Sequence, residues 1–174
     1  KSELQRLGDP ASALASVNGT LAADNDTCMF ATAFVAVLDT GSGRIRYANA
    51  GHNPPLLLDA DGVRYLSVKS GFVLGPMPDS VYETESRELQ PGDAFFLYTD
   101  GVTEAKNPGD ALYGEPRLAD VLRQVAGEPP EQMVRRIQAD VLQHAAGAPQ
   151  SDDITLLVVR FRGAVVGLGE SPDT

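Results

Sequence analysis

Three aspartates border two short apolar stretches of this sequence and could together hold a metal ion. Asp100 follows the stretch "FFLYT", and Asp152 and Asp153 come directly before "ITLLVV". If these stretches are antiparallel neighbouring strands, the end of one adjoins the start of the other, and the carboxylates meet at one rim of a sheet. Carboxylates gathered without a counter-charge repel each other. A hard divalent cation such as Mg²⁺ or Mn²⁺, which prefers oxygen ligands, would stabilise the group.

The same aspartates have a simpler interpretation, because aspartate at a strand end often forms a turn or caps a helix. Gly101 favours the metal site, since a residue without a Cβ lets the backbone approach an ion closely. The sequence alone leaves both interpretations open for Asp100, Asp152 and Asp153.

The two histidines and the single cysteine offer less. His52 lies with Asn53 in the loop "NAGHNPP", where polar side chains either bond their own backbone or face a ligand. His144 falls on the polar flank of a predicted helix and is interpreted as a solvated surface residue. Cys28 is expected to pack as a small apolar side chain. A lone cysteine forms no intrachain disulfide and fits a reducing compartment, so the predicted location is cytoplasmic.

The charge and several missing motifs argue against other classes of function. With 24 acidic and 14 basic residues, the net charge is −10, and no basic run reverses it locally. Nucleic acids and anionic membranes would be repelled. No apolar run approaches the ~20 residues that span a membrane. The sequence also lacks the G-x-S-x-G elbow of serine hydrolases and the Walker A motif of nucleotide-binding proteins.

The elements that would position the candidate residues come as a run of strands followed by helices. Periodicity predicts a helix over 9–22, with Asp9 as its N-cap and Pro10 in its first turn. Strands are predicted over 29–39, 44–51, 54–58, 63–66, 80–89, 94–99 and 152–161. Two further helices are predicted over 114–127 and 129–147, the first with Leu118, Val121, Leu122 and Val125 on its apolar face, and the second with Val134, Ile137, Val141 and Leu142.

Two of these strands are apolar on both faces. The stretch 29–39 therefore predicts a strand covered on both sides, and 152–161 predicts a central strand of its sheet. Strands 29–39 and 44–51 read as one hairpin, and 54–58 and 63–66 as another. The order of elements indicates an α+β protein with antiparallel sheets.

Four blocks, taken in order and spacing, give the sequence a family resemblance. They are "MFATAFVAVLD", "YANAGHNPP", "GDAFFLYTDGVTEA" and "DDITLLVV". Together they resemble the phosphatase domain of the stage II sporulation protein E and RsbU group, bacterial members of the metal-dependent serine/threonine phosphatases (PPM). The resemblance implies an α-β-β-α sandwich, in which two antiparallel sheets pack face to face between helices. The resemblance runs from about Pro10 to Phe161, and the predicted domain is 1–162. The glycine-rich residues 163–174 are predicted to form a flexible tail.

The resemblance also implies a reaction and a role for each candidate residue. Two Mn²⁺ or Mg²⁺ ions ~4 Å apart would hold a water and lower its pKa, so that hydroxide attacks phosphorus directly. Asp100 and Asp152 match metal ligands and are the predicted catalytic residues. The predicted metal site comprises Asp100, Gly101, Asp152 and Asp153, and the predicted substrate-binding residues are His52 and Asn53.

The implied partners belong to bacterial signal transduction. The substrate would be a phosphoserine or phosphothreonine on an anti-anti-sigma factor, a small STAS-domain protein of sigma-factor and stress-response regulation. An upstream sensor domain would control the activity.

One departure from the family pattern leaves a second interpretation open. The family carries an upstream block of the Asp-x-x-Gly-x-Gly type, whose aspartate bridges the two metals, and this sequence has none. We expect the sequence to be the C-terminal part of a longer domain whose preceding residues supply that ligand. The alternative is a catalytically inactive module of the same fold that binds a regulatory partner.

Overall fold

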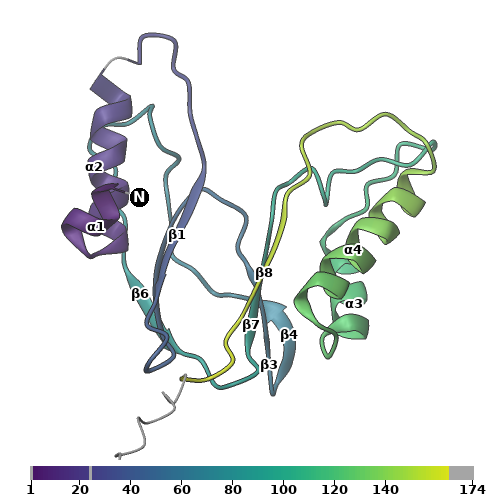
Figure 1. The fold of residues 1–174 in the computed structure, drawn as a ribbon. Coiled ribbons are helices and arrows are strands. Elements are labelled where there is room, and N and C mark those ends of the chain that lie inside the picture. Colours follow the sequence, from purple (N-terminus) through teal and green to yellow (C-terminus); the bar gives the residue numbers. More distant parts are fainter. Residues whose placement is uncertain (1, 24, 165–174) are drawn as a thin grey trace, which may run out of the picture.

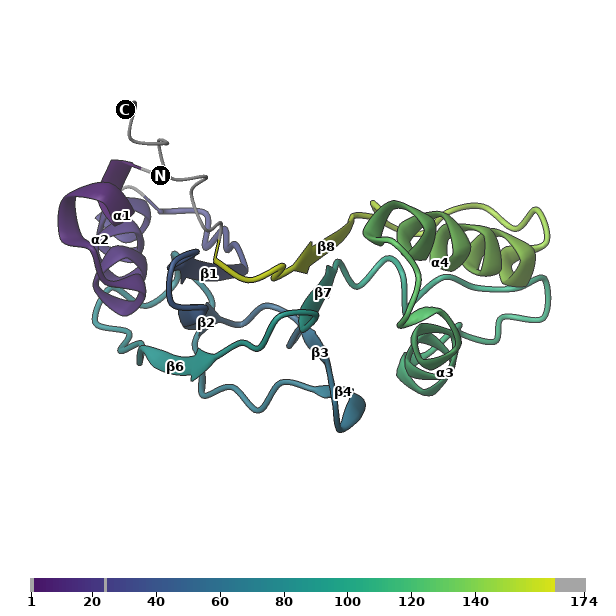
Figure 2. The ribbon, with the colours of Figure 1, turned by 60° about the horizontal axis from the view of Figure 1, so that its bottom comes forward.

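The computed structural model describes residues 2–23 and 25–164. These residues form four layers, with two sheets face to face and a pair of helices on each outer side (Figure 1, Figure 2). This arrangement confirms the predicted α+β class and the α-β-β-α sandwich. The predicted tail, 163–174, lies outside the described residues from position 165 onward.

The described residues contain four helices and eight strands. The helices are α1 (Ser2–Leu7), α2 (Pro10–Ala23), α3 (Glu115–Val125) and α4 (Pro130–Ala145). The strands are β1 (Ala33–Leu38), β2 (Arg44–Ala50), β3 (Leu56–Asp59), β4 (Gly62–Tyr65), β5 (Ser70–Gly71), β6 (Glu85–Glu88), β7 (Ala94–Tyr98) and β8 (Leu156–Arg160). No helix among them has the length and apolar character to cross a membrane.

The two sheets differ in strand order. In the first sheet, β2 pairs with β1 on one edge and with β6 and the short parallel β5 on the other. The second sheet has the order β4-β3-β7-β8, with every pair antiparallel. Both predicted hairpins are confirmed as β1–β2 and β3–β4. Tyr98 lies opposite Leu156, so the end of β7 adjoins the start of β8, as the sequence suggested.

Helix α2 begins where its cap predicts. The carboxylate of Asp9 accepts a hydrogen bond from the backbone N–H of Ser12 at 2.9 Å, which satisfies a free donor of the first turn. The other carboxylate oxygen of Asp9 accepts from the hydroxyl of Thr84 at 2.8 Å. The cap therefore also ties the helix to the segment that precedes β6.

The largest apolar cluster lies between the second sheet and the helices α3 and α4. Most of the predicted helical faces are confirmed, but the α4 face is wrong in part. Met133, Ile137 and Val141 form its buried stripe, four residues apart, whereas Leu142 is 61% exposed. Because apolar residues occupy two adjacent stripes of this helix, periodicity alone did not separate the one that packs from its neighbour.

The predictions for the two strongly apolar strands are wrong. Within the described residues β8 is the outermost strand of its sheet rather than a central one, and Leu157 is 51% exposed. β1 is likewise outermost and only partly covered. Leu157 lines an apolar groove of about 280 Å³ between the sheets, together with Val159 and with Phe34 and Leu38 of β1. An edge strand whose side chains face the opposite sheet is as apolar as a central strand, so composition could not distinguish them.

Two predicted side-chain environments also need correction. Cys28 does not pack inside the protein but lies exposed in the turn before β1, with a left-handed φ of 53°. His144 is half-buried rather than solvated. Its Nε2 lies 3.0 Å from the carbonyl oxygen of Ala111 and its Nδ1 lies 3.1 Å from Arg117, a pattern that places the proton on Nε2. His144 thus joins α4 to α3 and to the segment before it.

Candidate metal centre

The segments that carry the candidate aspartates are in contact at the end of β7 and the start of β8. We call residues 99–104 and 150–155 the acidic loops. They run side by side beyond the two strands (Figure 1). A Cβ built on the buried Gly101 would lie 2.5 Å from the carbonyl oxygen of Asp153 and 2.9 Å from that of Asp152. Any side chain at this position would push the two loops apart, so glycine permits their close approach.

The three aspartate carboxylates of the acidic loops are exposed, and their side-chain hydrogen bonds are local. Asp100 Oδ1 accepts from the N–H of Gly101 at 3.0 Å, and Asp152 Oδ1 accepts from the N–H of Asp153 at 2.6 Å. Across residues 2–23 and 25–164, no ion pair includes Asp100, Asp152 or Asp153. Their charge is therefore not compensated by a lysine or arginine of the described chain.

These oxygen donors fit a hard cation in kind. Carboxylate and carbonyl oxygens are the ligands that Mg²⁺ and Mn²⁺ prefer, and Mg²⁺ commonly binds through one or two carboxylates while keeping several waters. No group of three or more His, Cys, Asp or Glu side chains in the described part of the chain stands close enough to enclose a metal. The described residues therefore do not form a closed cage of side-chain ligands around Asp100 and Asp152.

The predicted substrate residues lie beside the acidic loops. Burial lowers the pKa of the half-buried His52, and the charge of Asp100 acts in the opposite direction, which places these two residues within electrostatic reach. Asn53 is a polar neighbour of the buried Tyr98 hydroxyl at the end of β7, which makes no hydrogen bond in the described residues. The loop between β2 and β3 thus approaches the rim where β7 ends.

Sequence reasoning missed two residues that shape this rim. Asn49 is 1% exposed, and its side chain accepts from the N–H of His52 at 2.9 Å and donates to the carbonyl of His52 at 2.8 Å. An asparagine three residues before the histidine is a local signal for such a turn. Thr99 bridges the acidic loops through its hydroxyl. Only the pairing of β7 with β8 reveals this role of Thr99.

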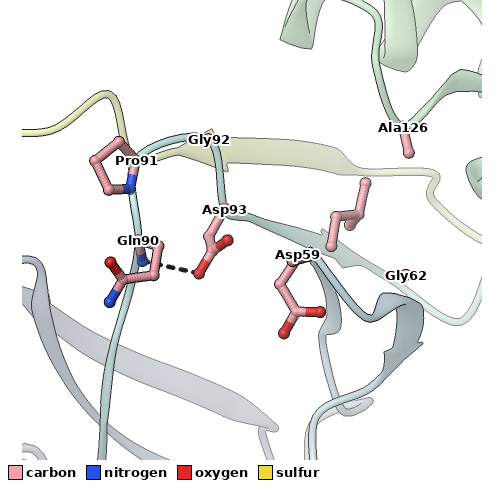
Figure 3. A pocket seen from close by; sticks show the side chains of 9 residues that line it. Asp59, Gly62, Gln90, Pro91, Gly92, Asp93 and Ala126 are labelled. Atoms are coloured by element: carbon pink, nitrogen blue, oxygen red, sulfur yellow. Dashed lines mark hydrogen bonds between the residues drawn. The ribbon is translucent and has the colours of Figure 1, made fainter.

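The opposite rim of the second sheet also carries aspartates, in a shallow pocket of about 320 Å³ (Figure 3). We call Asp59, Arg64 and Arg87 the arginine rim. Asp59 accepts from Arg64 at 2.7 and 2.5 Å and from Arg87 at 3.3 Å. The hydrogen bonds from Arg64 hold the pKa of the Asp59 carboxyl below its usual range. Asp93, which also lines this pocket, accepts from the backbone N–H of Gln90 at 2.9 Å (Figure 3).

Comparison with known proteins finds the same fold and similar sequences. Residues 1–162 match the family described as stage II sporulation protein E (SpoIIE). The chain is 35% identical to protein IcfG of Synechocystis over 77% of its own length and 21% of that protein. It is 30% identical to phosphoserine phosphatase RsbU of Bacillus subtilis, over 87% of this chain and 45% of the relative. It also superposes on the SiaA-PP2C domain of Pseudomonas aeruginosa with a TM-score of 0.79 and 25% identity, covering 92% of this chain and 65% of that one.

Proposed function

Because this chain belongs to the stage II sporulation protein E (SpoIIE) family, we propose that it is a metal-dependent phosphatase domain of the PPM type. The proposed reaction is hydrolysis of phosphoserine or phosphothreonine on a bacterial regulatory protein. One observation carries the proposal: the acidic loops touch at Gly101 and present carboxylates that no cation of the described chain neutralises. Similarity to a phosphoserine phosphatase supports the same reaction.

Each candidate residue has a distinct role in this proposal. Asp100 and Asp152 would hold Mn²⁺ or Mg²⁺, and Gly101 keeps their loops together. Asp153 supports the site from beside Asp152. When bound, two such cations would supply activation of a water for direct attack on phosphorus. His52, held by Asn49, would contact the phosphorylated segment of the substrate together with Asn53.

The proposed substrate is a phosphorylated anti-anti-sigma factor of the STAS-domain type. The chain spans less than half of RsbU and about a fifth of IcfG. We propose that an upstream sensor domain controls this phosphatase domain in the whole protein. A cytoplasmic location follows from the proposed substrate and suits the single cysteine.

The test is Mn²⁺-dependent hydrolysis of para-nitrophenyl phosphate by the 174-residue chain, with Asp152→Asn as the control. Turnover that needs Mn²⁺ and disappears in the control would support the proposal. The same assay on a protein extended at its N-terminus shows whether preceding residues complete the site. Absence of turnover from both proteins would contradict the phosphatase and favour a module that only binds a partner.

A further inference from the structure

The hydroxyl of Thr99 links the two acidic loops directly. It donates a hydrogen bond to the carbonyl oxygen of Asp153 at 2.7 Å and accepts one from the backbone N–H of Thr155 at 2.8 Å. The backbone N–H of Thr99 donates in turn to the carbonyl of Thr155 at 3.2 Å. One residue therefore makes three hydrogen bonds to the segment that carries Asp152 and Asp153.

These bonds continue the β7–β8 contact beyond its last paired residues, and a side-chain hydroxyl replaces one main-chain acceptor. Leu156, the first residue of β8, pairs with Tyr98, the last residue of β7. One step beyond this pair, the N–H of Thr155 bonds to the side-chain hydroxyl of Thr99 instead of to a main-chain carbonyl. Beyond this point the two segments no longer pair as strands. The Thr99 hydroxyl nevertheless links the backbone of one segment to that of the other.

The carbonyl of Asp153 is consequently confined from two directions. Thr99 binds it through the hydroxyl, and Gly101 stands so close that a Cβ would lie 2.5 Å from it. Fixing this peptide also fixes the adjacent peptide of Asp152, whose carbonyl lies 2.9 Å from the same built Cβ. The Cα of Asp152 begins the first of these two peptides, and the Cα of Asp153 joins the first to the second, so the carboxylates of both residues branch from the confined backbone.

We propose that Thr99 is a positioning residue of the metal centre, whose hydroxyl sets where the carboxylates of Asp152 and Asp153 stand relative to Asp100. The inference rests on the proposed function, because it assigns the cation to the acidic loops. Partners that orient metal ligands without touching the metal typically change metal affinity by about 10–100-fold when they are removed.

The substitution Thr99→Val tests this role at nearly constant volume. Valine keeps the shape of threonine but leaves the carbonyl of Asp153 and the N–H of Thr155 without a side-chain partner. Thr99→Ser keeps the hydroxyl and should restore both bonds. Thr84→Val is a matched control, because the Thr84 hydroxyl also accepts from a backbone N–H, that of Ala11 at 3.0 Å, and donates to Asp9 away from the acidic loops.

Two measurements on the 174-residue chain test the positioning role of Thr99. The first is Mn²⁺ affinity by titration calorimetry, and the second is hydrogen exchange of the Thr155 amide without metal. Thr99→Val should weaken Mn²⁺ binding by about 10–100-fold and speed exchange at Thr155. Thr99→Ser should stay close to the wild type in both. Thr84→Val should leave Mn²⁺ affinity unchanged even where it lowers the melting temperature.

The outcomes separate this inference from the proposed function. If the wild type binds Mn²⁺ and Thr99→Val binds it with the same affinity, the inference alone is overturned. The inference is also overturned if Thr84→Val weakens Mn²⁺ binding as much as Thr99→Val does. Absence of Mn²⁺ binding from both the wild-type chain and a protein extended at its N-terminus would overturn the proposed function and this inference together. If only the extended protein binds Mn²⁺, the same variants are compared in that protein. If Thr99→Val does not fold, Thr99→Ala takes its place with the same expected losses.

Discussion

At one end of β7 the carboxylate of Asp59 is bound by two arginines, and at the other end the carboxylates of Asp100 and Asp152 are bound by backbone N–H groups. Asp59 of the arginine rim accepts hydrogen bonds from both Arg64 and Arg87. Asp100 and Asp152 of the acidic loops accept side-chain bonds only from the N–H of the residue that follows each of them. Asp59 thus has two arginine partners, whereas Asp100 and Asp152 have no lysine or arginine partner within the described chain.

This difference separates a structural carboxylate from one that is free to bind an external cation. The side chain of Asp59 is 9% exposed, and it connects the two sheets, because Arg87 belongs to β6 of the first sheet and Asp59 to β3 of the second. An ion pair in this setting fixes the packing of the sheets. The carboxylates of the acidic loops connect nothing in the described chain, which leaves their oxygens available to a metal.

The largest effect is expected from removing a carboxylate of the acidic loops. Asp100→Asn and Asp152→Asn should each lower Mn²⁺-dependent phosphatase activity more than about 100-fold, since even supporting residues cost about 10–100-fold. The melting temperature without metal should stay the same or rise, because a net charge of −10 loses one repelling charge. Activity assays and thermal unfolding on the same samples measure both. Full activity in either variant would remove that residue from the proposed site.

A smaller loss is expected when the acidic loops are pushed apart. In Gly101→Ala the new Cβ would meet two backbone carbonyls that have little freedom to yield. We expect Mn²⁺ affinity to fall at least about tenfold and the free energy of unfolding to fall by about 1–3 kcal/mol. Gly127→Ala is the control, since a Cβ there meets nothing within 4 Å. Equal Mn²⁺ binding by the two variants, measured by calorimetry, would show that the close approach is irrelevant to the metal.

The arginine rim should show the reverse pattern, with stability lost and activity kept. Asp59→Asn removes the charge that two arginines share, at an expected cost of about 1–3 kcal/mol. This loss of stability stays modest because the side chains of Arg64 and Arg87 are 39% and 37% exposed, so solvent screens their charges. Asp61→Asn is the matched control, since the Asp61 side chain is 84% exposed and stands 3.7 Å from Arg64. Urea unfolding measures stability, and a loss of activity in Asp59→Asn at saturating Mn²⁺ would contradict the division between the rims.

The rim of the acidic loops could be located from the sequence because its signals are local. An apolar strand that ends in "TDG" and another that begins with "DD" predict adjacent strand ends once the two strands pair, and the β7–β8 register agrees. The cap at Asp9 is also a local signal, and the structure confirms it.

The other features of the two rims depend on contacts between residues that are far apart in the sequence. Thr99 and Thr155 are 56 residues apart, and only the register of β7 against β8 brings the hydroxyl of one to the N–H of the other. The arginine rim likewise joins Asp59 to Arg87 from the other sheet. The position of β8 at the edge of its sheet had no sequence signal, because Leu157 and Val159 face the groove between the sheets.

The smallest expected effect is a pH dependence that belongs to the arginine rim. Arg64 holds the pKa of Asp59 below its usual range through hydrogen bonds to the carboxylate. A carboxyl whose folded pKa is lowered contributes stability that is complete above its unfolded pKa of about 3.9 and is lost as the pH falls through the folded pKa. The stability difference between the wild type and Asp59→Asn should therefore be full at about pH 6 and shrink towards about pH 3. Urea unfolding of both proteins at the two pH values measures it. A difference that stays constant would mean that the Asp59 charge does not stabilise this rim, and the contrast with the acidic loops would then rest on geometry alone.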